Sequence, residues 1–419
     1  MTLFLSVACL LMVLVLSKLE RKRLLITITP VFSLGVPYSV LMIAVAIYDF
    51  IQPSYYDKMH FLVPIVSMFF LLYFYGIGQF VTSGKISFIK WSTSTFNERK
   101  ANGITYQNGL IKYFVIVGIL LVFASEFVHF GLSISNTDEF KDFFSQGIIS
   151  HVVNLVSLLF LVHYAGENET KLDKYVDYIA VVWALFLILA NAKYSALMYA
   201  ASLLIIKVNC AKVKVSKVKI GVGLLIISGL FILTYTLRFL VQGFTLETMP
   251  FDFIFQHFFF YLTNGYYTFS KVLIEGISST PGVGWGVFWG PIMNVFNVFL
   301  GLSTVGSMSN FVDYYEGRIF SSNTFTLFGS LILESGWIGA IFSMTVLSVV
   351  TYTILRLYLS KRGINYNALY AFINSTLIFS FFNCFYGTVN VWEKITLLFI
   401  ISYLLRYKIK VTHKKSIFR

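Results

Sequence analysis

The chain has 419 residues, of which 57% are hydrophobic and only 12% are charged, and its formal net charge is +13. A soluble domain carries about 25% charged residues, so this chain has too little polar surface to fold as two or three water-soluble domains. Most of it must face lipid. The positive charges lie between apolar segments, so they indicate bilayer topology rather than binding to nucleic acid.

The first apolar segment is predicted to be a helix that is retained in the mature protein. Residues 2–16 have no basic region before them, and they run into Lys18–Arg23 without a small-residue cleavage site. The cysteines, Cys9, Cys210 and Cys384, are far apart in the sequence. That spacing argues against a disulfide framework, a CxxC metal site or a thiol nucleophile.

Eleven apolar segments follow one another along the chain, and we interpret each as a membrane-spanning helix. Several are near the length of about 20 residues that crosses the hydrocarbon core, whereas the first, sixth and seventh are short. The predicted spans are 2–17, 25–48, 61–80, 112–133, 147–165, 175–190, 193–207, 219–240, 326–356, 366–386 and 389–405.

The distribution of basic residues predicts the orientation of these spans. With eleven spans, the alternate loops and the tail 406–419 hold all but seven of the 32 Lys and Arg residues. The positive-inside rule makes this set cytoplasmic, so we expect the N-terminus outside and the C-terminus in the cytoplasm. The seven exceptions are Lys58, Lys141, Lys193, Arg238, Lys271, Arg318 and Lys394.

The prediction is therefore an all-α polytopic membrane protein with a large, partly helical extracytoplasmic loop. Residues 1–240 form an eight-span bundle, 241–325 the loop, 326–405 a three-span bundle and 406–419 a basic cytoplasmic tail. Two loop segments, 251–275 and 284–300, are apolar enough to be re-entrant or spanning. One extra span would move the basic tail outside, so thirteen spans is the alternative that preserves the charge pattern.

The predicted loop is unusually aromatic. Between Phe244 and Phe269 its rings alternate with polar residues, and Tyr266 and Tyr267 belong to this set. An aromatic belt that anchors the loop at the interface is one interpretation. Rings with polar edges also stack on sugar faces, so the loop as a whole favours a binding site.

The sequence around the start of the ninth span is more specific. Asn323-Thr324-Phe325-Thr326 precedes Glu334-Ser335-Gly336, and Gly339 follows three residues later. The apolar run from there to Arg356 is too long for one perpendicular span. Gly336 and Gly339 would allow it to kink or to pack closely against a neighbour.

These motifs, after a large external loop, resemble the O-antigen polymerase (Wzy) type of oligosaccharide repeat-unit polymerase. The chain departs from that family because Glu334-Ser335-Gly336 stands where many relatives have Asp-Phe-Gly. Asn191-Ala192-Lys193-Tyr194-Ser195, between two short spans, is a second similarity, although relatives often carry an Arg followed by Ser there.

The resemblance implies a glycosyltransferase of the bacterial inner membrane, with its active site on the periplasmic side. Such enzymes join undecaprenyl-diphosphate-linked oligosaccharide repeats into O-antigen or capsule-like polysaccharide, and the lipid diphosphate is the leaving group. The expected partners are these lipid-linked oligosaccharides, the bilayer and, as an open alternative, a chain-length regulator. We expect no metal and no cofactor.

This chemistry requires cations for the diphosphate. Arg238, at the end of the eighth span, and Arg318, just before the Asn323 motif, lie on the side where charge is sparse, and Lys193 is a weaker candidate. Arginine binds phosphate oxygens bidentately. The alternative is that these are helix-end residues that extend to the interface.

The chemistry also requires a base for the acceptor hydroxyl. His257 is one candidate because an imidazole titrates near neutrality, and its alternative role is that of a cap or a solvated residue. Glu334 is the other candidate, and it could instead be the ion-pair partner of an arginine. The candidates for contacting glycan are Asn323, Tyr266, Tyr267, Asp313 and Tyr314.

Two other functions remain open. An O-antigen ligase-like transferase would need the same loop and arginines but would use a different acceptor. A flippase or transporter for lipid-linked oligosaccharide is less favoured, because the uneven loops show no inverted repeat and few charges are predicted at the midplane.

Overall fold

The computed structural model is a bundle of α-helices. It describes residues 1–51, 58–83, 111–130, 143–144, 147–166, 171–189, 193–209, 229, 232–233, 236, 239–240, 243–245, 247–276, 286–303, 312–313, 321–322, 325–360 and 366–406. The helices are α1 (Thr2–Leu24), α2 (Pro30–Ile51), α3 (Leu62–Thr82), α5 (Ile111–Phe130), α7 (Gly147–Ala165), α8 (Lys171–Leu189), α9 (Lys193–Asn209), α11 (Phe251–Glu275), α12 (Gly286–Phe299), α13 (Leu327–Leu359), α14 (Asn367–Ile378) and α15 (Val389–Arg406). Two short 3-10 helices, η2 (Phe379–Phe381) and η3 (Phe385–Gly387), separate α14 from α15.

Two very short strands complete the described elements. β1 (Val312–Asp313) and β2 (Ser321–Ser322) pair antiparallel, with Val312 opposite Ser322. They lie within the segment that the sequence predicts as a loop.

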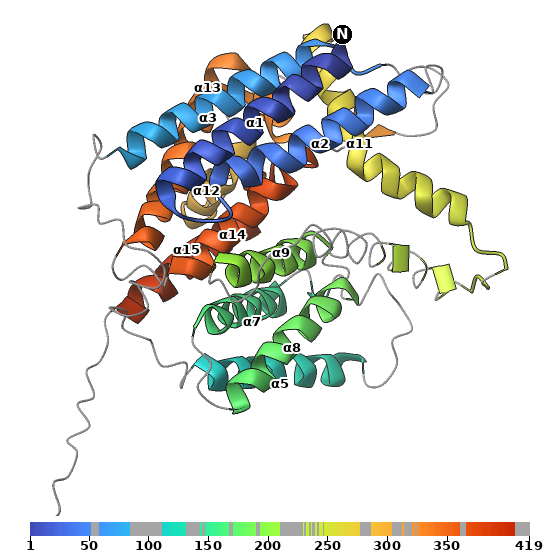
Figure 1. The fold of residues 1–419 in the computed structure, drawn as a ribbon. Helices are drawn as coiled ribbons and strands as arrows, with labels where there is room; N and C mark the ends of the chain where they lie inside the picture. The colour runs from blue at the N-terminus through green and yellow to red at the C-terminus, as the bar shows by residue number, and fades with distance from the viewer. Residues whose placement is uncertain are drawn as a thin grey trace, which may run out of the picture.

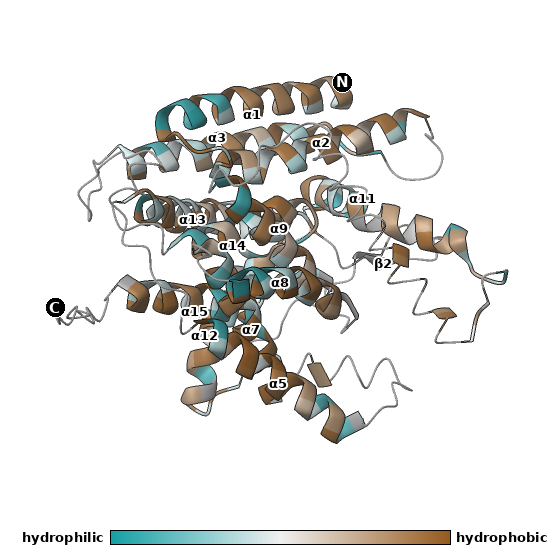
Figure 2. Ribbon diagram, turned by 60° about the horizontal axis from the view of Figure 1, so that its bottom comes forward, coloured by the Kyte–Doolittle hydropathy of each residue, from teal (hydrophilic) through white to brown (hydrophobic). Residues whose placement is uncertain are grey.

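Among the described residues, six helices are long and apolar enough to cross a membrane: α1, α2, α3, α5, α7 and α13. Most of the ribbon is hydrophobic, with a hydrophilic stretch at the basic end of α1 (Figure 2). The predicted class, an all-helical protein with several apolar helices, is therefore confirmed. The count of eleven spans and the orientation stay predictions, and most of the predicted span 219–240 lies outside the described residues.

The helices form two groups joined by α14. One group holds α1, α2, α3, α11 and α13, and the other holds α5, α7, α8 and α9 (Figure 1). α14 lies between them and contacts both α2 and α9. Apolar side chains from both groups belong to one buried core.

Two predicted boundaries are wrong for physical reasons. The first span was expected to end at residue 17, but α1 continues through the basic residues to Leu24. The continuation is held by Glu20, which is fully buried and accepts hydrogen bonds from Val31 N and from the Tyr352 hydroxyl. The span predicted over 366–386 is also not one helix, because α14 ends at Ile378.

The helix ends that the sequence assigns to one side of the membrane meet in the structure. The Arg23 guanidinium donates to the side chains of Gln79 and Thr82, and Arg356 Nη1 donates to Val81 O at 2.9 Å. The ends of α1, α3 and α13 therefore lie together. These are the ends next to three of the basic loops.

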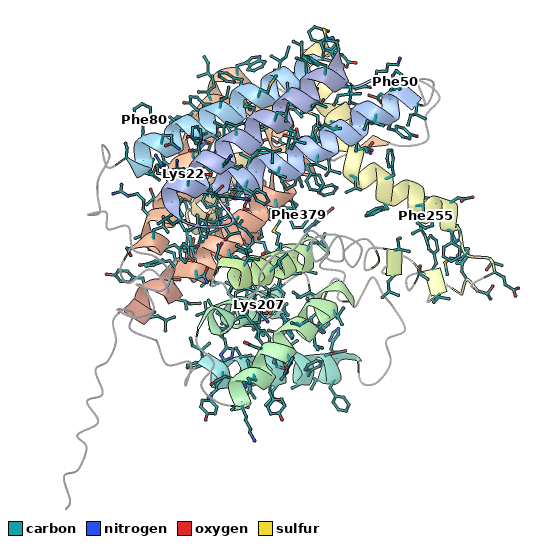
Figure 3. The ribbon with its side chains drawn as sticks, in the orientation of Figure 1. Lys22, Phe50, Phe80, Lys207, Phe255 and Phe379 are labelled. Carbon is teal, nitrogen blue, oxygen red and sulfur yellow. The ribbon has the colours of Figure 1, made fainter. Side chains whose placement is uncertain are left out.

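The opposite end of the same group is held by a different set of bonds. Met59 N and the Tyr267 hydroxyl both donate to the Asp49 carboxylate, at 2.8 and 2.6 Å, and His60 N donates to Ser270 Oγ at 3.0 Å. Lys22 and Phe50 accordingly lie at opposite ends of the α1–α3 group (Figure 3). The second half of α11 is thus fixed at the end away from the basic loops.

Candidate functional site

Within the described residues of the predicted spans, α13 contains a break in its helical backbone. Thr326 caps the helix, since its Oγ1 accepts from Gly329 N at 3.1 Å. Ten residues further on, Gly336 has φ 62° and ψ −174°, a conformation essentially restricted to glycine, and it interrupts the helix. The predicted kink at Gly336 is confirmed.

Ring contacts show how sharply the chain bends there. Phe70 stacks with Phe328 at a centroid distance of 5.2 Å and with Trp337 at 6.5 Å. In a straight helix two residues nine positions apart are separated by about 13 Å along the axis and lie on opposite faces. One ring can contact both only because the segment 327–335 is angled away from the rest of α13.

Glu334 lies in the last turn before this break, and it is only 3% exposed. Its carboxylate is close enough to the Cys384 thiol, between η2 and η3, to act on it electrostatically. An acidic group inside a spanning helix is costly to bury and is a functional candidate by default. Glu334 therefore remains a candidate residue, as the sequence predicts.

Close backbone contacts hold the broken helix in place. A Cβ atom at Gly265 of α11 would lie 2.7 Å from Phe381 O of η2 and 3.2 Å from the Thr326 backbone nitrogen. One at Gly329 would lie 3.2 Å from the Phe269 side chain. Two glycines thus allow α11, the start of α13 and η2 to meet.

The second helix break lies beside the first. Between α14 and α15 the chain turns through η2 and η3, and this turn also contacts α12 and α15. Phe379 lies between the α1–α3 group and α9 (Figure 3). Non-helical backbone at membrane depth is tolerated only where it is buried in protein or lines a cavity, so two adjacent breaks mark a specialised place in the fold.

The η2–η3 turn also contacts the start of α9. The Tyr194 ring lies 5.3 Å from Phe382 and 5.6 Å from Phe385, measured between ring centroids. Next to it, Lys394 Nζ of α15 donates to Ser195 Oγ at 3.0 Å, and Lys394 is 5% exposed.

Glu393, the residue before Lys394 in α15, contacts α7 instead of α9. Glu393 pairs with His151 of α7 at 2.7 Å and accepts from Asn154 Nδ2 at 3.4 Å. Sequence reasoning counted Lys394 only among the seven exceptional cations. Its pairing with Ser195 joins segments 199 positions apart, and no local pattern indicates it.

Two predicted glycan-contacting tyrosines are packing residues in this structure. Tyr266 is fully buried and its hydroxyl donates to Tyr38 O at 2.6 Å. Tyr267 is 3% exposed and its hydroxyl donates to Asp49. Both fix α11 to α2, and neither ring presents a free face for a sugar.

The other predicted residues are located less completely. His257 lies in the first half of α11, Lys193 begins α9 and Asp313 ends β1. These three positions are placed by their backbone. Four further predicted residues lie outside the described part of the chain: Arg238, Arg318, Asn323 and Tyr314.

The outer half of α11 differs from the half that is fixed to the bundle. It projects away from the bundle and carries Phe255, which is 52% exposed (Figure 3). Phe251 and Phe253 are also exposed, whereas Ile254, between Phe253 and Phe255, packs with Met249. An aromatic, amphipathic segment of this kind is typical of the membrane interface.

The site thus combines a buried carboxylate, Glu334 at the break in α13, with a buried amine, Lys394 near the η2–η3 turn. A carboxylate can accept a proton from a hydroxyl group, and an ammonium group can bind an anion. Within the described residues, no three His, Cys, Asp or Glu side chains are grouped as metal ligands would be.

Comparison with known proteins gives a family but no function. No curated protein and no solved structure matches the chain. A family model described as "Family of unknown function (DUF6337)" matches residues 55–411, which is most of the chain. The protein therefore belongs to this family of unknown function.

Proposed function

We propose that this protein is a membrane-embedded glycosyltransferase that polymerises oligosaccharide repeat units carried on undecaprenyl diphosphate. The observation that supports the proposal best is the buried Glu334 at the break of α13, next to the second break between α14 and α15. The proposed compartment is the periplasmic side of a bacterial inner membrane.

In this proposal Glu334 accepts the proton of the acceptor hydroxyl as the new glycosidic bond forms. The bond between the sugar and the lipid diphosphate breaks, and the diphosphate departs with the electron pair. The leaving group gains negative charge, so cations beside it stabilise the transition state. Arg238, Arg318 and Lys193 keep this proposed role, and His257 remains the alternative base.

The placement of α11 agrees with a lipid-linked substrate. Its inner half is fixed to the bundle beside α13, and its outer half exposes phenylalanines at the end of the molecule away from the basic loops. A substrate with a polyprenyl tail and a polar head needs both an apolar surface and a polar site close to it. α11 connects the two.

Transport is the second candidate function, because one observation favours it. Broken helices also form the substrate sites of many transporters, and α13 is a broken helix. A ligase-like transferase would share the whole site with a polymerase and would differ only in its acceptor.

Purified protein in liposomes, supplied with lipid-linked repeat units, tests these alternatives. A polymerase produces a ladder of longer lipid-linked glycans from this one substrate, with and without a chelator. A flippase moves the substrate across the bilayer without lengthening it, and a ligase forms no ladder until a second acceptor is added. Repeat units that are unchanged in length would contradict the proposal.

A further inference from the structure

The start of α15 holds a buried lysine, Lys394, that forms no ion pair with any residue in the described part of the chain. Lys394 is 95% buried, since only 5% of its surface is exposed. Among the described residues, the only hydrogen bond of Nζ is the one to Ser195 Oγ, and no carboxylate lies within ion-pair distance. An ammonium group has three donors, so two of them have no acceptor among the described residues.

Glu393, the carboxylate nearest to Lys394 in the sequence, is not its ion-pair partner. Glu393 directs its oxygens to His151 and Asn154 instead. The other buried lysine with a described partner shows the ordinary arrangement, because Lys112 Nζ lies 3.2 Å from Asp173 Oδ1. Buried charges in proteins are normally paired in this way.

The side chain of Lys394 reaches the first turn of a helix. Ser195 is the third residue of α9, a helix of 17 residues. The first backbone N–H groups of a helix have no acceptor within it and carry the positive end of the helix dipole. An ammonium group, a hydroxyl group and a helix start therefore converge, and each of them is a donor to an anion.

We propose that Lys394, Ser195 and the start of α9 form a binding subsite for a phosphate or diphosphate group. The η2–η3 turn links the subsite to Glu334, since Phe382 and Phe385 contact Tyr194 next to Ser195, and Cys384 between them is influenced by the Glu334 carboxylate. As the site of a departing lipid diphosphate, it rests on the proposed function. Its proposed ability to bind an anion depends only on the positions of Lys394, Ser195 and the start of α9.

Binding to the purified full-length protein tests the subsite without requiring turnover. The probes are farnesyl diphosphate, inorganic diphosphate and farnesol, and the readout is the dissociation constant. Lys394→Met should weaken binding of both diphosphates at least about tenfold, because it removes a charged hydrogen-bond donor. Lys394→Arg should retain most of the affinity, and Ser195→Ala should show a smaller loss.

Lys112→Met is the matched control, because it removes a buried lysine that already has a carboxylate partner. It should lower the melting temperature without changing diphosphate affinity. Farnesyl diphosphate binding tighter than inorganic diphosphate would identify a lipid headgroup as the ligand, and equal binding would identify the free anion. Unchanged affinity in a folded Lys394→Met protein would overturn the subsite.

The outcomes also separate the subsite from the proposed function. If the wild-type protein forms glycan ladders but Lys394→Met binds diphosphate normally, the subsite is wrong and the polymerase remains. If Lys394→Met loses diphosphate binding but the wild-type protein forms no ladder, the anion site remains and the polymerase is wrong. Should Lys394→Met fail to fold, Ser195→Ala carries the same comparison, and unchanged diphosphate affinity in that variant would overturn the subsite.

Discussion

Individual polar side chains determine how α11 is attached to the bundle. The Tyr267 hydroxyl donates to the Asp49 carboxylate, whereas the neighbouring Tyr266 hydroxyl donates to a backbone carbonyl. A hydrogen bond to a charged group contributes about 1.5–3 kcal/mol, compared with about 1 kcal/mol for a neutral pair. The two tyrosines thus offer a matched pair of hydroxyl deletions.

We predict that Tyr267→Phe lowers the free energy of unfolding by about 1.5–3 kcal/mol and Tyr266→Phe by about 1 kcal/mol. Chemical denaturation in mild detergent measures both. Glycan binding should be unchanged in each variant, because both rings are buried. A Tyr267→Phe protein of normal stability that no longer binds glycan would restore the sugar-contacting role predicted from the sequence.

At the scale of single elements, the break in α13 is the feature on which the site depends. Gly336 holds a backbone conformation essentially restricted to glycine. Gly276, at the end of α11, also has a positive φ, 59°, but with ψ 29° it lies in the left-handed region that other residues can adopt. In both cases a Cβ would meet nothing within 4 Å, so only the backbone distinguishes them.

We predict that Gly336→Ala costs about 1–3 kcal/mol of stability and reduces glycan transfer, because it shifts the position of Glu334. Gly276→Ala should cost about 1 kcal/mol and leave transfer unchanged. Unfolding curves and the transfer assay, run on both proteins, make the comparison. Equal activity in the two variants would show that the break does not position the site.

The elements that sequence predicts well are those set by local patterns. Apolar length located α3, α5, α7 and α13 to within three residues at each end, and Gly336 was identified as a break because glycine interrupts helices. The extension of α1 was missed because the burial of Glu20 depends on Tyr352, which is 332 positions away. The end of α14 at Ile378 was missed because the residues after it are as apolar as a span.

The residues of the candidate site also differ in whether a local sequence pattern identifies them. Glu334 could be chosen from its sequence, since an acidic residue in an apolar run is conspicuous. The pairing of Lys394 with Ser195 could not, because it depends on how α9 and α15 pack. Tyr266 and Tyr267 were assigned to a surface because their neighbours are aromatic, but the inner half of α11 is buried.

At the scale of the whole molecule, the fold separates two ends. The ends of α1, α3 and α13 meet through Arg23 and Arg356, and the opposite end is joined through Asp49. The start of α15 meets the starts of α7 and α9, two helices of the second group, through Glu393 and Lys394. The pairs of ends that meet are those that the positive-inside rule assigns to one side.

We predict that Lys22→Cys reacts with a membrane-impermeant thiol reagent only after cells are permeabilised, and that Phe50→Cys reacts in intact cells. Both are made in a background in which Cys9, Cys210 and Cys384 are replaced. Phe50 is 83% exposed at the end of α2 opposite Lys22 (Figure 3). The reverse labelling pattern would invert the orientation and place the proposed chemistry in the cytoplasm.

The central claim is that glycan transfer takes place at the broken helix, and the rate of polymerisation by Glu334→Gln tests it most directly. Glu20→Gln is the matched control, because it removes the charge of another fully buried glutamate, one that belongs to the opposite end of the molecule. We predict that Glu334→Gln lowers the rate in liposomes about 100-fold or more, as loss of a general base does, while folded Glu20→Gln remains active. Equal rates for Glu334→Gln and the wild-type protein would contradict the claim.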